Sequence, residues 1–234
     1  TLNPHSPTNP YCVQNGLTID PTYPSTLSVG NLKQTGASGS SFASGILGTL
    51  PCDGGGKFYW EAKCLGTYTT NAYLSFGVAP MDLPRIPAGD VNGVFVIPGQ
   101  NLYQGASITF NGGSATNLRA NSLAQNDNIV SSFTIAANDF VQIAFDSATQ
   151  KVWFGKNNTW YNSGNPATGA TPSSTLTATD KYWFPFYATY TTSDIFQINY
   201  GATDFEYTPP TGFEKVNATQ LTTDITRTAS DTNK

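Results

Sequence analysis

Short segments in which apolar and polar residues alternate recur along the whole chain, whereas helical periodicity is almost absent. Residues 57–64 place two sets of side chains on opposite faces: Phe58, Trp60, Ala62 and Cys64 against the charged Lys57, Glu61 and Lys63. Residues 138–146 alternate as clearly, with Val141, Ile143 and Phe145 opposite Phe140, Gln142 and Ala144. A period of two is the pattern of a β-strand with one buried face. We therefore predict a protein built from short strands.

Turn sequences between these segments predict how the strands pair. Asn111-Gly112-Gly113 follows the strand 107–110 and predicts a hairpin, because Asn and Gly accept positive φ angles. Residues 147–150 turn the strand 138–146 back into an antiparallel partner at 151–156. Three more strands are predicted, at 72–80 (ended by Pro80), 182–190 and 194–201, the last two forming a pair joined by residues 191–193. Residues 81–100 contain too many prolines for regular structure.

Strands of this length without a long helical stretch between them predict an all-β fold, either an antiparallel sandwich or a barrel. The chain has no internal repeat and no linker before residue 214. Aromatic residues stop after Phe213, and the residues beyond it are polar. We predict a single β-domain over residues 1–214 and a polar tail or connector over residues 215–234.

The composition excludes two classes of partner. Charged residues make up only 11% of the 234 residues, and 11 Lys+Arg against 15 Asp+Glu give a net charge of −4. Nucleic-acid binding is not expected, because it needs clustered basic residues. Membrane insertion is not expected either, since no apolar run approaches the ~18–20 residues that cross a bilayer. The N-terminal residues contain neither a signal-peptide pattern nor an initiator Met, so we expect a processed or excised product.

Five segments in this order resemble a SPRY domain, in the form found in bacteriophage and other viral particle proteins. Residues 13–19 resemble the opening strand of that family, and residues 56–64 (GKFYWEAKC) resemble its Gly-Lys-aromatic-aromatic-Trp-Glu strand. Residues 74–80 match the strand with Gly-Val. Residues 138–169 match the hairpin with Phe-Asp, Trp-Phe, Lys-Asn, Trp and Gly-x-Pro, and residues 184–213 match the closing strands with Pro-Pro-x-Gly-Phe.

The resemblance implies a two-sheet antiparallel β-sandwich of the concanavalin-like jelly-roll type, with no catalytic residues and no cofactor. Surface loops would bind a partner, and the candidate loops are 81–106, 111–128, 156–172 and 189–193. We expect a virion structural or adhesion module of a phage fibre, spike or capsid surface, facing outward from the particle. Its partners would be other virion proteins or a host surface receptor, either glycan or protein. Phage fibres imply a homotrimer.

Two alternatives to this function remain open. One is a capsid decoration or assembly protein without a host ligand, and the other is a cellular SPRY adaptor that binds a short peptide. An enzyme is not expected. His5 is the only histidine, and the carboxylates are scattered among turns rather than paired for general acid–base chemistry.

Metal and cysteine chemistry add little to this picture. Residues 89–93 and 126–128 offer oxygen ligands but lack the acidic density of a calcium loop, so no metal site is expected. Cys12, Cys52 and Cys64 lack the C-x-x-C spacing of a metal or redox site. One disulfide and three reduced core thiols are equally consistent with the sequence.

A small set of aromatic and amide residues is the candidate ligand site. Trp160 is expected to fold back and cap the sandwich, but the tyrosine that follows it lies between polar turn residues. An aromatic ring beside amides can stack on a sugar while the amides bind its hydroxyls, and such rings also anchor protein partners. The candidate residues are Tyr103, Asn157, Tyr161, Asn162 and Tyr190.

Overall fold

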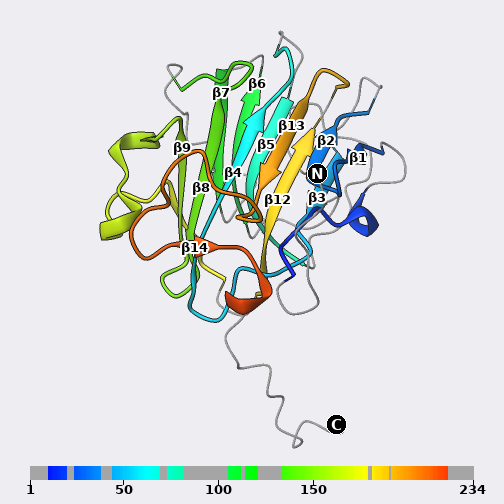
Figure 1. The fold of residues 1–234 in the computed structure, drawn as a ribbon. Helices are drawn as coiled ribbons and strands as arrows, with labels where there is room; N and C mark the ends of the chain where they lie inside the picture. Colours follow the sequence, from blue (N-terminus) through cyan, green and yellow to red (C-terminus); the bar gives the residue numbers. More distant parts are fainter. Residues whose placement is uncertain are drawn as a thin grey trace, which may run out of the picture.

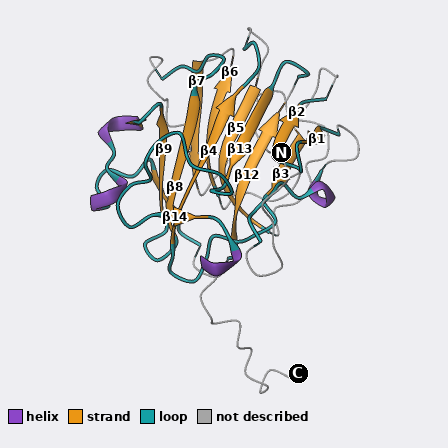
Figure 2. Ribbon diagram, viewed as in Figure 1, coloured by secondary structure: helices purple, strands orange, loops and turns teal. Residues whose placement is uncertain are grey.

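Two β-sheets packed face to face make up the protein, as the computed structural model shows (Figure 1). The structure describes residues 10–19, 24–37, 44–68, 73–81, 105–111, 114–120, 133–178, 181–189 and 191–220. Within these ranges the regular structure is β-strand and short 3₁₀-helix (Figure 2). The predicted all-β, two-sheet sandwich is confirmed.

The larger sheet has nine strands, and seven of them form a continuous path. In spatial order these are β1 (Thr26–Ser28), β2 (Lys33–Thr35), β13 (Ile195–Asn199), β4 (Lys57–Cys64), β8 (Phe140–Asp146), β9 (Lys151–Lys156) and β10 (Thr159–Trp160). Strand β11 (Ser174–Thr175) pairs with β9. Strand β14 (Glu214–Lys215) pairs with β4 and is parallel to it, unlike the antiparallel pairs of the main path.

The smaller sheet has five strands. Their order is β3 (Ser44–Leu47), β12 (Trp183–Thr189), β5 (Tyr73–Pro80), β6 (Ala106–Asn111) and β7 (Ser114–Ala120). Strands β6 and β7 form the predicted hairpin around residues 112–113. Short 3₁₀-helices lie outside the sheets: η1 (Gly16–Thr18), η2 (Tyr161–Ser163), η3 (Pro166–Thr168) and η4 (Ala218–Gln220).

The main core lies between the two sheets and is rich in aromatic rings. Strand β4 directs Phe58, Trp60, Ala62 and Cys64 into it, as the alternation predicts. Phe76 of the smaller sheet meets Phe196 of the larger one edge-on, with ring centroids 5.1 Å apart. Such edge-to-face pairs add to the free energy gained by burying the rings. The two sheets are therefore held at a fixed separation by interlocking rings.

A second, smaller apolar cluster covers the outer face of the larger sheet. Residues 201–213, called here the strap, run across this face before β14 (Figure 1). The strap contributes Phe205 and Phe213, which pack with side chains that alternate outward from the sheet: Tyr59, Ala144, Trp153 and Trp160. Trp160, which was expected to cap the sandwich, is half-buried in this outer cluster. The predicted polar face of 57–64 is partly buried, and Glu61 is only 1% exposed.

The structure corrects three of the strand predictions. Residues 182–190 and 194–201 do not pair, because β12 belongs to the five-stranded sheet and β13 to the nine-stranded sheet. The connection at 191–193 therefore crosses between sheets. Residues 13–19 contain η1 rather than an opening strand. The predicted loop 111–128 contains β7, whose period-two pattern is weak. Residues 82–100 lie outside the described residues.

Regular structure continues into the segment predicted as a tail. Of residues 215–234, Lys215 belongs to β14 and residues 218–220 form η4. Val216 is fully buried, and Asn217 forms a bridge with Tyr11. Packing against β4 and the N-terminal segment therefore continues past Phe213, although the aromatic residues stop there.

The three cysteines are reduced and buried. Of the two alternatives that the sequence left open, one disulfide or three core thiols, the structure shows the core thiols. Burial raises the pKa of Cys12 to about 11 and that of Cys64 to about 12. Because the thiolate is the reactive form, these thiols are inert at neutral pH.

Candidate functional site

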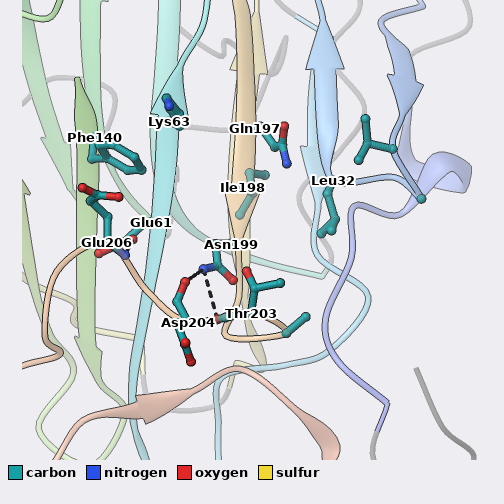
Figure 3. Close-up of a pocket in the computed structure, with 13 residues that line it drawn as sticks. Leu32, Glu61, Lys63, Phe140, Gln197, Ile198, Asn199, Thr203, Asp204 and Glu206 are labelled. Atoms are coloured by element: carbon teal, nitrogen blue, oxygen red, sulfur yellow. Dashed lines mark hydrogen bonds between the residues drawn. The ribbon is translucent and has the colours of Figure 1, made fainter. Parts of the chain in front are cut away.

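An open groove on the outer face of the nine-stranded sheet is the candidate site (Figure 3). Its volume is about 620 Å³, which lies within the usual range for ligand sites. Strands β8, β4 and β13 form its floor, and the strap and the β1–β2 turn form its walls. The lining residues are Val29, Gly30, Leu32, Glu61, Lys63, Phe140, Gln197, Ile198, Asn199, Ala202, Thr203, Asp204 and Glu206.

Lys63 and Phe140 form one end of the groove. They are directly opposite each other on β4 and β8, and the Lys63 Nζ lies 5.4 Å from the centre of the Phe140 ring. This is the geometry of a cation–π contact. Tyr207 of the strap forms a T-shaped contact with the same ring, with centroids 5.8 Å apart. Phe140 therefore holds an ammonium group on the sheet and packs against the strap.

Glu61 fixes the strap to the sheet. Its Oε2 accepts a hydrogen bond of 2.9 Å from the backbone N–H of Glu206, and its Oε1 accepts one of 2.9 Å from that of Tyr207. The Tyr59 hydroxyl donates a third hydrogen bond, of 2.6 Å, to Oε1. Hydrogen bonds to a carboxylate are stronger than neutral ones. A buried carboxylate without such donors would be costly, so the three bonds explain why Glu61 is tolerated here.

The network continues from Glu61 to the β9–β10 turn. Gln142 Nε2 donates to the Tyr59 hydroxyl at 2.8 Å, and the backbone N–H of Asn158 donates to Gln142 Oε1 at 2.5 Å. Burial, and then the hydrogen bond to Glu61, raise the pKa of Tyr59 well above its usual value. Tyr59 therefore stays a neutral donor. Its hydroxyl group links β8 to the carboxylate that holds the strap.

Asn199 holds the beginning of the strap. Its Nδ2 donates to the backbone carbonyls of Thr203 at 3.2 Å and Asp204 at 2.9 Å, and its Oδ1 accepts from Gly201 N at 2.9 Å. Gly201 has a φ of +96°, and a Cβ there would lie 2.3 Å from Lys215 Cβ. Glycine is thus required by both conformation and space. The sequence Asn199-Tyr200-Gly201 builds a tight turn that aims the strap across the sheet.

Two exposed carboxylates of the strap line one wall of the groove. Phe205 turns inward onto Tyr59, with ring centroids 4.9 Å apart, so its neighbours Asp204 and Glu206 are left exposed. In Figure 3 the Glu206 side chain reaches toward Phe140. The ion pairs of the described residues are Lys57–Asp146 and Lys156–Asp139, and neither includes these two carboxylates.

The opposite wall is a turn with an unusual backbone. Val29, Gly30 and Asn31 all have positive φ, of 53°, 63° and 63°. Leu32 N closes the turn by donating to the Ser28 carbonyl at 3.1 Å. A β-branched residue such as Val29 rarely adopts this conformation. Val29 is 54% exposed, so the turn presents an apolar side chain at the rim of the groove.

Three of the five sequence-predicted ligand residues can be placed, and they lie outside the groove. Asn157 is in the β9–β10 turn, where its Oδ1 accepts from Phe140 N at 2.8 Å and its Nδ2 donates to Asp139 Oδ1 at 2.7 Å. Tyr161 packs edge-on against Phe133, with centroids 5.7 Å apart, and Asn162 is exposed. These three residues do not line the groove. Tyr103 and Tyr190 lie outside the described residues.

Sequence reasoning missed the groove because its residues come from distant segments. Glu61 and Lys63 were assigned to a solvent face, and the strap was recognised only as a closing motif. One signal was available: Glu61 is one of three glutamates in the chain and lies within a strand of large aromatic residues. A carboxylate in that setting needs buried donors.

The described residues show no constellation for metal chemistry. No group of three or more His, Cys, Asp or Glu side chains within this part of the chain could hold a metal ion.

None of the helices in the described part of the chain has the length and apolar character needed to span a bilayer.

Comparisons with known proteins concern the fold. The SPRY domain of human HERC1 superimposes with a TM-score of 0.50 at 17% identity, covering 83% of this chain and 99% of that domain. The chain has a SPRY-like fold. Another human SPRY domain (TM-score 0.49, 10% identity, covering 77% of this chain and 97% of that one) is also similar. So is the carbohydrate recognition domain of Emp47p, at a TM-score of 0.47 and 12% identity, over 80% and 91% of the two chains.

Sequence comparison gives no match at the family level. Neither a scan against protein-family models nor a search of the curated proteins finds a match to this chain. Support for the SPRY-like resemblance of the five sequence segments therefore comes from the similarity in fold to the SPRY domain of HERC1.

Proposed function

We propose that this chain is a non-catalytic binding module on the surface of a virus particle, within a fibre, spike or capsid-surface protein. It binds a host surface receptor or another virion protein. The observation that carries the binding role is the groove of about 620 Å³ on the nine-stranded sheet. Its floor consists of paired strands, so a ligand would not have to order it on binding.

The arrangement of the groove favours binding over catalysis. Its one buried carboxylate, Glu61, already accepts three hydrogen bonds from the protein. General acid–base chemistry needs a group that can reach substrate and exchange a proton. Glu61 instead serves to position the strap, and the other lining residues offer charge, amides and one aromatic ring.

Placement on a particle is supported by the viral form of the SPRY-like segments and by the charge-poor composition. The test is to label source particles with an antibody against residues 1–214 and to image them. Label at fibre or tail tips supports a host-attachment module, and label over the capsid supports decoration or assembly. If particles carry no label, the virion role is refuted and a cellular SPRY adaptor becomes the better explanation.

A binding assay then locates the contact surface. The purified chain is presented to host surfaces and to separated particle proteins, with Gln197→Ala/Asn199→Ala as a groove variant and Asn162→Ala as a loop variant. Loss of binding in the groove variant alone assigns contact to the groove. Loss in the loop variant alone assigns it to the predicted loop 156–172. Retention in both variants refutes both surfaces.

A role in assembly is a second candidate, favoured by a pair of exposed apolar residues. Met81 is 72% exposed and Tyr182 is 65% exposed. Pro80 pairs with Trp183 at the end of β5 and β12, so the register continues with Met81 opposite Tyr182. Large apolar side chains grouped on a surface mark contact sites. Tyr182→Ser should then weaken association between subunits, measured by sedimentation, without weakening ligand binding.

A further inference from the structure

We infer that the groove selects a basic side chain, Arg or Lys, presented by a protein partner. This inference rests on the proposed binding function and names the chemistry of its ligand. It is argued from the charge of the groove, from how the charges are held, and from the state of the aromatic ring. Of the sequence-predicted ligand residues, the three that the structure describes, Asn157, Tyr161 and Asn162, take no part.

The charges that line the groove are unbalanced. Three carboxylates, those of Glu61, Asp204 and Glu206, stand against the single amine of Lys63, which gives the lining a net charge of −2 (1 − 3). The Glu61 carboxylate is satisfied by its three donors. Asp204 and Glu206 are exposed and form none of the ion pairs found in the described residues. Groups of opposite charge on a partner would complement them.

The backbone that carries these two carboxylates is fixed before any ligand arrives. The Asp204 carbonyl accepts from Asn199 Nδ2 at 2.9 Å, and Glu206 N donates to Glu61 Oε2 at 2.9 Å. Between them, Phe205 is anchored on Tyr59. Two carboxylates on a restrained backbone lose little conformational entropy when they bind a cation. A guanidinium group, with its planar fork of donors, suits such acceptors best.

The aromatic ring favours a cation over a sugar. Phe140 is the aromatic residue of the described groove lining. The Lys63 ammonium lies over its ring at 5.4 Å, and Tyr207 makes a T-shaped contact with it at 5.8 Å. A sugar needs an open aromatic face to stack on, and the Lys63 ammonium already lies over one face of this ring. A ring that already attracts one ammonium group shows that this position favours positive charge.

The test is a titration of the full chain with an acetylated and amidated Gly-Gly-Arg-Gly-Gly peptide, followed by ¹H–¹⁵N NMR. The matched probe replaces Arg by citrulline, which has nearly the same shape but no charge. We expect shifts at Asn199, Asp204 and Glu206, and affinity for the citrulline peptide weaker by at least about tenfold, the factor for one charge-assisted hydrogen bond. Raising the salt concentration should weaken the arginine peptide only.

Variants separate the groove from general charge effects. Asp204→Asn/Glu206→Gln should abolish the preference for arginine over citrulline. The control Asp53→Asn/Glu214→Gln makes the same change in net charge outside the groove and should leave the preference unchanged. Lys63→Met removes the competing cation, so it should raise affinity for the arginine peptide.

Three outcomes would overturn the inference. They are equal binding of the two peptides, shifts that map outside the groove, and groove shifts caused by a panel of neutral oligosaccharides instead of the arginine peptide. The proposed function fails separately, when the chain binds neither particle proteins nor host surfaces. A partner that binds through the groove without arginine selectivity would refute the inference and leave the proposed function intact.

Discussion

Replacing Glu61 by Gln tests whether the buried carboxylate holds the strap. The amide keeps one acceptor oxygen. If that oxygen takes the place of Oε1, it still accepts from Tyr59 and Tyr207, but the new NH₂ group faces the Glu206 N–H. One hydrogen bond to a charged group, worth about 1.5–3 kcal/mol, is lost, and the other two become neutral bonds of about 1 kcal/mol each.

The loss is partly offset because an amide is less costly to bury than a carboxylate. We expect a net destabilisation of about 2–4 kcal/mol. For a domain of this size, about 1 kcal/mol shifts the melting temperature by roughly 2–4 °C, so the expected decrease is roughly 5–15 °C. Urea unfolding followed by tryptophan fluorescence measures the free energy directly, with m held in common between the variants.

Glu206→Gln is the matched control. It makes the same chemical change and the same change in net charge, but its side chain is exposed and only its backbone N–H takes part in the network. This control should unfold within about 0.5 kcal/mol of the natural chain. Hydrogen exchange at the amides of Glu206 and Tyr207 should accelerate in Glu61→Gln alone. A Glu61→Gln protein as stable as the control, with protected strap amides, would refute the reasoning.

Four further predictions concern the core, the turns and the buried thiols. Gly77→Ala should lower the free energy of unfolding by more than about 3 kcal/mol, because the new Cβ would lie 2.0 Å from the Ala106 carbonyl oxygen on the paired strand. A variant with the natural chain's stability in urea would contradict this packing. Gly201→Ala should loosen the strap, because Gly201 has a φ of +96° and the new Cβ would lie 2.3 Å from Lys215 Cβ. We expect this variant to lose binding in the groove but to retain the Trp fluorescence of the main core. Unchanged binding would contradict the role of the turn. Because burial raises the pKa of Cys12 from 9.0 to about 11, the contribution of this thiol to folding stability should be present below pH 9 and should decrease by about 2 kcal/mol by pH 11. Cys12→Ala should therefore lose less stability over that interval than the natural chain. The three thiols should react with a disulfide reagent at pH 8 only after unfolding, and labelling of the native chain would show that they are accessible.

Local alternation predicted much of the fold correctly. The faces of β4 and β8 follow directly from residues 57–64 and 138–146, because a side-chain period of two is a property of any strand. The hairpins β8–β9 and β6–β7 follow from their turn residues. The pairing of β12 and β13 was wrong, since nothing in residues 191–193 distinguishes a hairpin turn from a crossing between sheets.

Local sequence patterns could not predict the candidate site. Its decisive contacts join Glu61 to Glu206 and Tyr207, which are 145 and 146 residues away. A pattern along β4 shows that Glu61 faces away from the main core, but not that a distant segment covers it. Tyr161 was chosen because it lies among amides, and that local setting does not reveal its packing against Phe133.

The strap has a consequence for how the chain becomes functional during synthesis. One wall of the groove comes from residues 29–32, but the other comes from residues 202–206, held by Asn199 and closed by β14. A ribosome must therefore translate nearly the whole domain before the groove exists, and the long loop between Glu61 and Glu206 must close late in folding. A chain that stops at residue 200 would have most of the sheet strands but no recognition surface, so premature products would not compete with the finished protein for its partner.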